Sequence, residues 1–259
     1  MDLGLKGRRA IVCGGSKGMG RATARRLSLE GALVVIVART PATLVEAAEA
    51  ITAESGAPVE FFTTDLTIEA GRAALVRAHP FPDILVANAG VPQAQVPYQD
   101  LSRDEWLKWF DVHFFSAIDL VYAYAPGMCD RRFGRIVNIS ANFIKFPQVG
   151  VPSHAARLAL AGALASLVRE VAPFNVTVNS ILPGLVDTDA LRTSLQHRAD
   201  ARGVPYETIE KEVRIRNAAD RISDPQEVGD LIAMVCAAQM GFVTGQNIVN
   251  DGGAFQGLF

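Results

Sequence analysis

Short runs of apolar, often β-branched residues alternate along this chain with longer segments whose apolar residues recur at helical spacing. The short runs predict strands over residues 9–13, 33–38, 59–63, 84–87, 135–139, 176–181 and 247–249. The longer segments predict helices over 18–30, 41–54, 68–78, 103–131, 152–172 and 225–238, with Pro126 and Gly127 able to bend the fourth helix late. The strands read as continuous apolar runs, which is typical of a sheet covered by helices on both faces.

This regular alternation of strand and helix predicts an α/β fold with a doubly wound parallel sheet of about seven strands. The sequence contains no internal repeat, low-complexity tract or linker, so residues 1–259 are expected to form a single domain. The polar stretch over 187–221 interrupts the alternation. We expect it to be a charged excursion from the domain that could act as a lid over a substrate.

Composition narrows the classes of partner. The chain has 25 basic and 27 acidic side chains and a net charge of −2, so no basic field favours nucleic acid or an anionic membrane. Its three cysteines, Cys13, Cys129 and Cys236, are too few and too widely spaced for a disulfide framework or a metal site. No apolar stretch reaches the roughly 18 residues that span a bilayer. A cytoplasmic protein without a metal is the expectation.

A glycine-rich turn joins the first strand to the first helix, with the sequence CGGSKGMG over 13–20. Such a turn lets the backbone approach a pyrophosphate, and the N-terminus of the helix offers it unpaired N–H groups and a positive dipole end. The turn therefore predicts dinucleotide binding, the alternative being an ordinary tight turn. The candidate contacts are Gly14, Ser16, Lys17, Gly18, Met19 and Gly20.

The second strand bears on the choice of nucleotide. An NAD site usually carries an acid about 20 residues after the turn, but no acid lies between Gly31 and Thr43. Arg39 follows the strand instead and, with Lys17, favours a 2′-phosphate, hence NADP(H) over NAD(H). Arg39 could also be a solvated residue at the end of the strand. Asp65, next to Leu66, follows the third strand where an acid could accept a hydrogen bond from adenine.

The chain resembles the short-chain dehydrogenase/reductase family over nearly its whole length, which implies a single Rossmann-like domain. The turn is similar to the family's TGxxxGxG, with Cys13 in place of threonine. Later segments resemble further family motifs: Asn88-Ala89-Gly90, the strand at 135–140, Asn179 to Gly184 with Thr188, and Gly245-Gln246 with Asp251-Gly252-Gly253. The resemblance implies cofactor contacts by Asn88, Ala89, Gly90, Pro183, Gly184 and Thr188.

The family's catalytic tetrad of Asn, Ser, Tyr and Lys is missing. His113 stands at the asparagine position, and Ala141 stands at the serine position with Ser140 one residue earlier. Ser153 and Arg157 stand at the tyrosine and the lysine. The departure is not an alignment slip, because the only tyrosines in the chain are Tyr98, Tyr122, Tyr124 and Tyr206.

The residues at these positions suggest a different route for the proton. A serine hydroxyl is a far weaker acid than a phenol, so Ser153 cannot take over the role of the tyrosine. Arg157 can anchor the nicotinamide ribose but cannot donate a proton. His154 and Lys145 are the candidates for proton transfer. The alternatives are that His154 merely caps the start of its helix or faces solvent, and that Lys145 is an exposed loop residue. His113 is a further candidate, with a structural hydrogen bond as the alternative.

These observations predict an NADP(H)-dependent oxidoreductase that acts on a small carbonyl or alcohol substrate through a non-standard proton relay. A catalytically inactive subunit that binds cofactor or pairs with an active homologue is the alternative, and a lyase or dehalogenase is a third reading. The helix over 152–172 is rich in small residues, and in the family it forms a subunit interface. The resemblance therefore implies a homodimer or homotetramer, or a hetero-oligomer with an active homologue.

Overall fold

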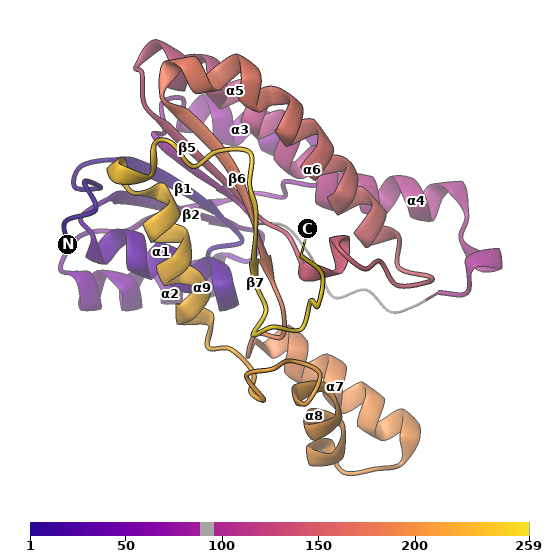
Figure 1. The fold of residues 1–259 in the computed structure, drawn as a ribbon. Helices are drawn as coiled ribbons and strands as arrows, with labels where there is room; N and C mark the ends of the chain where they lie inside the picture. The colour runs from indigo at the N-terminus through magenta and orange to yellow at the C-terminus, as the bar shows by residue number, and fades with distance from the viewer. Residues whose placement is uncertain (89–95, 259) are drawn as a thin grey trace.

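The apolar runs form one parallel sheet in a computed structural model that describes residues 1–88 and 96–258. Within these residues the sheet has seven strands in the order β3-β2-β1-β4-β5-β6-β7, and every neighbouring pair is parallel. The predicted fold class is confirmed (Figure 1). The strands are β1 Arg9–Cys13, β2 Leu33–Ala38, β3 Glu60–Thr63, β4 Ile84–Ala87, β5 Gly134–Ile139, β6 Val176–Pro183 and β7 Asn247–Asn250.

Helices cover both faces of the sheet, and each face has its own apolar core. One core joins the sheet to α1 Gly18–Leu29, α2 Pro41–Ser55 and α9 Pro225–Cys236, through residues such as Leu27, Leu44 and Ile232. The other joins it to α3 Glu69–Ala78, α5 Ser116–Asp130 and α6 Pro152–Val171, through residues such as Leu75 and Leu120. Burial of both faces explains why the strands are apolar at successive positions and do not alternate.

The segment predicted as one helix over 103–131 is divided into three parts. It begins as α4 Arg103–Phe110, passes through a π-helical turn over Asp111–Phe115, and continues as α5 to Asp130. The prediction of one uninterrupted α-helix was therefore wrong. A π turn inserts one extra residue into the helical repeat, and apolar periodicity averaged over a long window does not reveal it.

The polar stretch over 187–221 contains two helices that the sequence analysis did not predict, α7 Asp189–Arg202 and α8 Tyr206–Arg214. They form a hairpin that projects from the body of the molecule (Figure 1). Their small shared core has four fully buried residues, Leu195, Ala199, Ile209 and Val213. In each helix the two buried residues are four positions apart, which is the spacing of one helical face.

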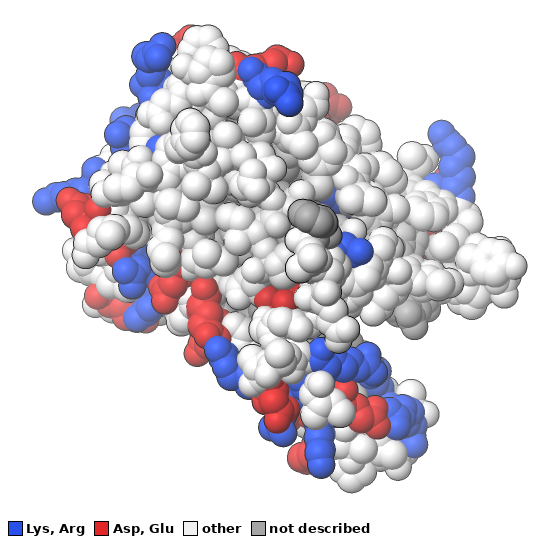
Figure 2. Space-filling model, in the orientation of Figure 1, with Lys and Arg blue, Asp and Glu red and all other residues white. Residues whose placement is uncertain are grey.

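Charged side chains of both signs are intermixed over this hairpin, whereas the centre of the same face of the molecule is largely uncharged (Figure 2). Four arginines of the stretch form ion pairs with nearby acids in the chain. The pairs are Arg192 with Asp187, Arg202 with Glu212, Arg214 with Asp220, and Arg221 with Glu227.

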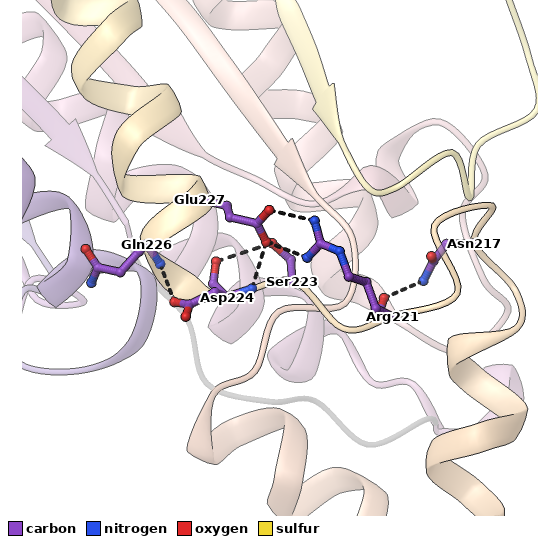
Figure 3. A network of polar contacts seen from close by, with 6 residues as sticks. All are labelled: Asn217, Arg221, Ser223, Asp224, Gln226 and Glu227. Carbon is purple, nitrogen blue, oxygen red and sulfur yellow. Dashed lines mark hydrogen bonds and ion pairs between the residues drawn. The ribbon is translucent and has the colours of Figure 1, made fainter.

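A polar network fastens the end of this stretch to α9 (Figure 3). Glu227 accepts two hydrogen bonds from Arg221, at 2.6 and 2.7 Å, and further bonds from the Ser223 hydroxyl and the Asp224 amide. These donors, Arg221 first, lower the pKa of Glu227 to about 2. Asp224 and Glu227 form a capping box, in which each side chain accepts a hydrogen bond from backbone N–H groups at the start of α9 and fixes the residue at which the helix begins.

Among the helices that the structure describes, none has an apolar stretch that could span a lipid bilayer.

Candidate active site

Most of the residues predicted to carry chemistry lie at one edge of the sheet. The glycine-rich turn follows β1, Asn88 follows β4, the segment 140–145 follows β5, and Gly184 follows β6. These four strands are consecutive neighbours in the order β1-β4-β5-β6, so their carboxyl ends meet. Successive strands add to one side of β1 as far as β3 and then to the other side from β4, and ligands of such sheets bind at this reversal. Ala89 and Gly90, also predicted as cofactor contacts, lie outside the described residues.

The glycine-rich turn is in close backbone contact with α1 and Asn88. A Cβ atom on Gly20 would lie 2.2 Å from the carbonyl oxygen of Gly14, and one on Gly14 would lie 2.6 Å from Asn88 Nδ2. Gly14 and Gly18 also have positive φ angles of 63° and 52°. Lys17 precedes the helix and makes no side-chain capping bond, so α1 presents its first N–H groups without a side-chain cap. This bare backbone cradle fits a pyrophosphate.

The turn also meets the segment that follows β6. A Cβ atom on Gly18 would lie 3.0 Å from Thr188 Cγ2. The Thr188 hydroxyl caps α7 by accepting from the Leu191 amide at 3.2 Å. Ser16, Lys17 and Gly18 line a hollow of about 620 Å³ together with Thr188 and its neighbours. The glycine-rich turn, predicted to bind the pyrophosphate, therefore lies close to Thr188, predicted to lie near the nicotinamide.

The two residues predicted to contact a 2′-phosphate, Lys17 and Arg39, are exposed at this edge of the sheet. Lys17 Nζ is 3.8 Å from Asp189 Oδ2, and both side chains are well exposed. Arg39 is exposed after β2. Asp65 accepts from the amide and the hydroxyl of Thr67 at 2.9 and 2.8 Å. Partial burial raises the pKa of Asp65, but the Thr67 hydrogen bonds and the charge of Arg39 outweigh it and lower that pKa overall. Met19 packs against the core beside α1, α2 and α9, and Leu66 packs against the core on the other face of the sheet.

The end of β5 carries polar groups that are buried. Ser140 is 5% exposed and Asn142 is 3% exposed. Ser140 Oγ and Asn142 Oδ1 have no hydrogen-bond partner within 1–88 and 96–258. Asn142 Nδ2 donates to Asp251 Oδ2 at 3.1 Å. Sequence analysis did not single out Asn142, because its contact with Asp251 spans 109 positions of the chain.

Asp251 ties together the ends of three strands. It follows β7, contacts Asn142 after β5, and lies so close to Gly184 after β6 that a Cβ atom there would be 2.7 Å from its own Cβ. The cofactor candidates Pro183 and Gly184 are therefore held beside the same carboxylate, with the Gly184 amide donating to Asn250 O at 3.0 Å.

His154 is held in its neutral form. The side chain is 7% exposed, and its Nδ1 accepts from the Gln148 amide at 3.1 Å. Its ring stacks on Phe143, with centroids 5.0 Å apart. Burial, followed by the charge of Arg157, lowers the pKa of His154 to about 4. At neutral pH the ring proton therefore resides on Nε2.

Ser153 and Arg157 lie on the same helix, α6. Ser153 is buried, and Arg157 is half-buried with Nη1 donating to the Ile139 carbonyl at 3.3 Å. Burial lowers the pKa of Arg157 to about 10, which leaves it charged at neutral pH. Arg157 therefore holds a cation against the end of β5, beside Ser140 and Ala141. This placement suits an anchor for a ribose hydroxyl.

The remaining two candidates lie on different elements. His113 is buried in the π-helical turn, where its ring stacks on Trp109 with centroids 5.6 Å apart, and this turn packs against α6. Lys145 is half-buried in the loop after β5, with Nζ 5.7 Å from the centroid of Phe255. Phe255 comes from the C-terminal turn, and sequence analysis gave it no role.

Comparison with known proteins finds relatives of similar sequence and fold. A family model described as short chain dehydrogenase matches residues 8–199. The uncharacterized oxidoreductase YvaG of Bacillus subtilis is 27% identical, over 100% of both chains. The structure of L-sorbose reductase from Gluconobacter frateurii, complexed with NADPH and L-sorbose, has a TM-score of 0.93 and 26% identity over 100% of both chains. A 3-oxoacyl (acyl-carrier-protein) reductase from Agrobacterium tumefaciens with NADP bound has a TM-score of 0.86 and 30% identity, over 97% of this chain and 96% of that one.

Replacing Gly20 by alanine should damage the cradle. Its Cβ would collide with the backbone of Gly14, and relief requires the turn to move, at a cost of about 3 kcal/mol in unfolding free energy. Gly162→Ala is a matched control within a helix, since nothing lies within 4 Å of its Cβ, and it should gain up to about 1 kcal/mol. Denaturant unfolding measures both changes. Equal stability of the two variants would contradict the close approach.

The neutral state of His154 should appear in the pH dependence of stability. Its pKa is lower in the folded protein than the unfolded value of 6.5, so the stabilisation is complete above pH 6.5 and is lost as pH falls towards 4. Between pH 7 and 4.5 the wild type should lose about 2 kcal/mol more unfolding free energy than His154→Gln. Both proteins share every carboxylate, so the difference isolates residue 154. Parallel pH profiles would show that His154 titrates normally.

Proposed function

The chain belongs to the short chain dehydrogenase family, and on this premise we propose an NADP(H)-dependent oxidoreductase that acts on a small carbonyl or alcohol substrate without a catalytic tyrosine. The observation that carries the proposal is the glycine cradle, which leaves no room for a Cβ at Gly14 or Gly20 although all four tetrad residues are replaced. A protein that no longer bound a nucleotide would have no need of this arrangement.

The cofactor contacts follow from the cradle. The first N–H groups of α1 would meet the pyrophosphate, and Lys17 and Arg39 would supply positive charge to a 2′-phosphate. Arg157 would donate to the nicotinamide ribose in place of the family's lysine. Two structural neighbours are complexes, one with NADPH and one with NADP, and this supports the choice of the phosphorylated nucleotide. When bound, this nucleotide supplies or accepts the hydride.

Proton transfer needs a group that holds a proton at neutral pH and can release it. His154 fits this role poorly, because its pKa is about 4 and its Nδ1 is engaged by the Gln148 amide. Arg157 keeps its proton. We therefore assign proton donation in the reductive direction to the Lys145 ammonium, and hydrogen bonding of the substrate oxygen to the Ser153 hydroxyl. In the oxidative direction the Lys145 amine would accept the proton.

Two further parts of the chain complete the proposal. The hairpin of α7 and α8 would act as the substrate lid over 187–221, and the Arg221–Glu227 pair would attach its end to α9. The faces of α5 and α6 would form the contact of a homodimer or homotetramer. Exposed apolar residues on these helices, Tyr122 at 56% and Leu158 at 49%, support that assignment.

Cofactor choice can be tested by titrating NADPH and NADH into the protein in a calorimeter. NADPH should bind more tightly than NADH, and Arg39→Ala should weaken NADPH about tenfold while leaving NADH unchanged. Arg9→Ala, which removes an exposed arginine from the opposite end of β1, is the control. Equal affinity of the wild type for both nucleotides would remove the 2′-phosphate assignment, and absence of heat with either would remove the function itself.

The proton donor can be tested by following NADPH oxidation with ethyl pyruvate as the probe substrate. Lys145→Met should lower kcat about 100-fold at pH 7 with NADPH binding retained, because the alkoxide would lose its proton source. Lys6→Met, an exposed lysine that precedes β1, should leave the rate unchanged. Loss of activity in His154→Gln but not in Lys145→Met would reverse the assignment. A wild type that binds NADPH and reduces no carbonyl compound would favour the inactive subunit.

A further inference from the structure

A row of aromatic rings leads from the proton-transfer candidates to the C-terminal turn. His154 stacks on Phe143, Phe143 meets Phe146 edge to face at 5.4 Å, and Phe146 lies parallel to Phe255 at 6.0 Å. The row begins beside Ser153, the residue at the position of the family's tyrosine. It ends at the ring over which the Lys145 ammonium lies, at 5.7 Å. The aromatic wall, as we name Phe143, Phe146 and Phe255, is thus continuous with the proposed reaction site.

The last ring of the wall is held in place by the carboxylate of Asp251. This carboxylate accepts from three consecutive backbone amides, those of Gly253, Ala254 and Phe255, at 2.9 to 3.2 Å. The same group is bound by Asn142, one residue before Phe143. Asp251 therefore fixes the two chain segments that carry the wall relative to one another. Because the backbone that carries the Phe255 ring is held in this way, that backbone loses little freedom when a ligand stacks on the ring.

The wall is apolar but is not buried as a core would be. Phe146 is 37% exposed, Phe143 and Phe255 are half-buried, and Val149 on the same loop is 78% exposed. Contiguous exposed apolar surface on a folded chain is unfavourable and marks a place where something binds. The wall adjoins His154 and Lys145, the two candidates for proton transfer, which favours the substrate as its occupant.

We propose that Phe146 and Phe255 determine substrate specificity, and that the substrate is a carbonyl or alcohol with an aromatic or other flat apolar group next to the reacting carbon. Such a group would stack on the wall while its oxygen faced Ser153 and Lys145. This inference rests on the proposed function, since it names the substrate class of the same site. The lysine adds a second constraint, because its charge favours the electron-rich face of a ring.

The experiment compares two esters that differ only in a phenyl or a methyl group, ethyl benzoylformate and ethyl pyruvate. In the NADPH-dependent reaction the wild type should show a higher kcat/KM for the phenyl ester, and Phe255→Ala should reduce that preference about tenfold. Phe255→Tyr should retain it. The ratio is the readout because displacement of Lys145 would slow both esters alike, whereas loss of the wall affects only the phenyl ester. Phe174→Ala, which removes a 40% exposed ring at the amino end of β6, is the control and should change nothing.

A second readout is independent of turnover. Saturation-transfer NMR with ethyl benzoylformate should show binding through its ring protons in the wild type and about tenfold weaker binding in Phe255→Ala. Binding of this ester without any NADPH oxidation would support the aromatic wall as a binding surface and would contradict the proposed function. An unchanged ester preference in Phe255→Ala, or no binding of the phenyl ester by the wild type, would overturn the inference. A change of sedimentation in Phe255→Ala with unchanged ester binding would also overturn it, because the wall would then be a subunit contact.

Discussion

The site depends on one steric constraint, the contact between the backbone of Gly14, the first turn of α1 at Gly20, and the side chain of Asn88. No Cβ fits at either glycine, so β1 and α1 approach through backbone alone, and the Asn88 side chain packs directly against Gly14. Backbone N–H groups and the helix dipole can then face a ligand at this point, which is what an oxygen anion needs. The later segments, after β5 and β6, add their side chains around a cradle that this contact has already fixed.

The architecture could be predicted from sequence because both faces of the sheet are buried, which makes each strand a continuous apolar run. The α7–α8 hairpin was missed because its core has only four buried residues among many charged ones, so the stretch was read as a charged excursion without helices. The arginines of this stretch are another feature that the sequence shows only in part. At least four of them form ion pairs with acids up to ten residues away, such as Arg202 with Glu212, and sequence shows the charges but not this pairing.

Within the site, sequence identified the residues that belong to local motifs and missed those joined by long-range contacts. Gly14 to Gly20 belong to one turn, and Ser153, His154 and Arg157 can share one helical face, so spacing alone predicts that they lie together. Asn142 and Phe255 enter the site only through Asp251, which connects the ends of β5 and β7. The neutral state of His154 was equally hidden, since it arises from burial, the Gln148 amide and the charge of Arg157.

The effect of the Arg157 charge on His154 links the replaced residues of α6 to their neighbours. An arginine at position 157 can hold a ribose hydroxyl, but its fixed charge disfavours a second cation three residues earlier on the same helix. His154 is therefore neutral first because it is buried and second because Arg157 is charged. With serine in place of the phenol, α6 has no group that gives up a proton at neutral pH. A proton source for reduction must then come from another element, and the loop after β5 places Lys145 at the end of the aromatic wall. Catalysis in this chain would thus move from the helix to the loop, where it shares its supporting residues with substrate selection.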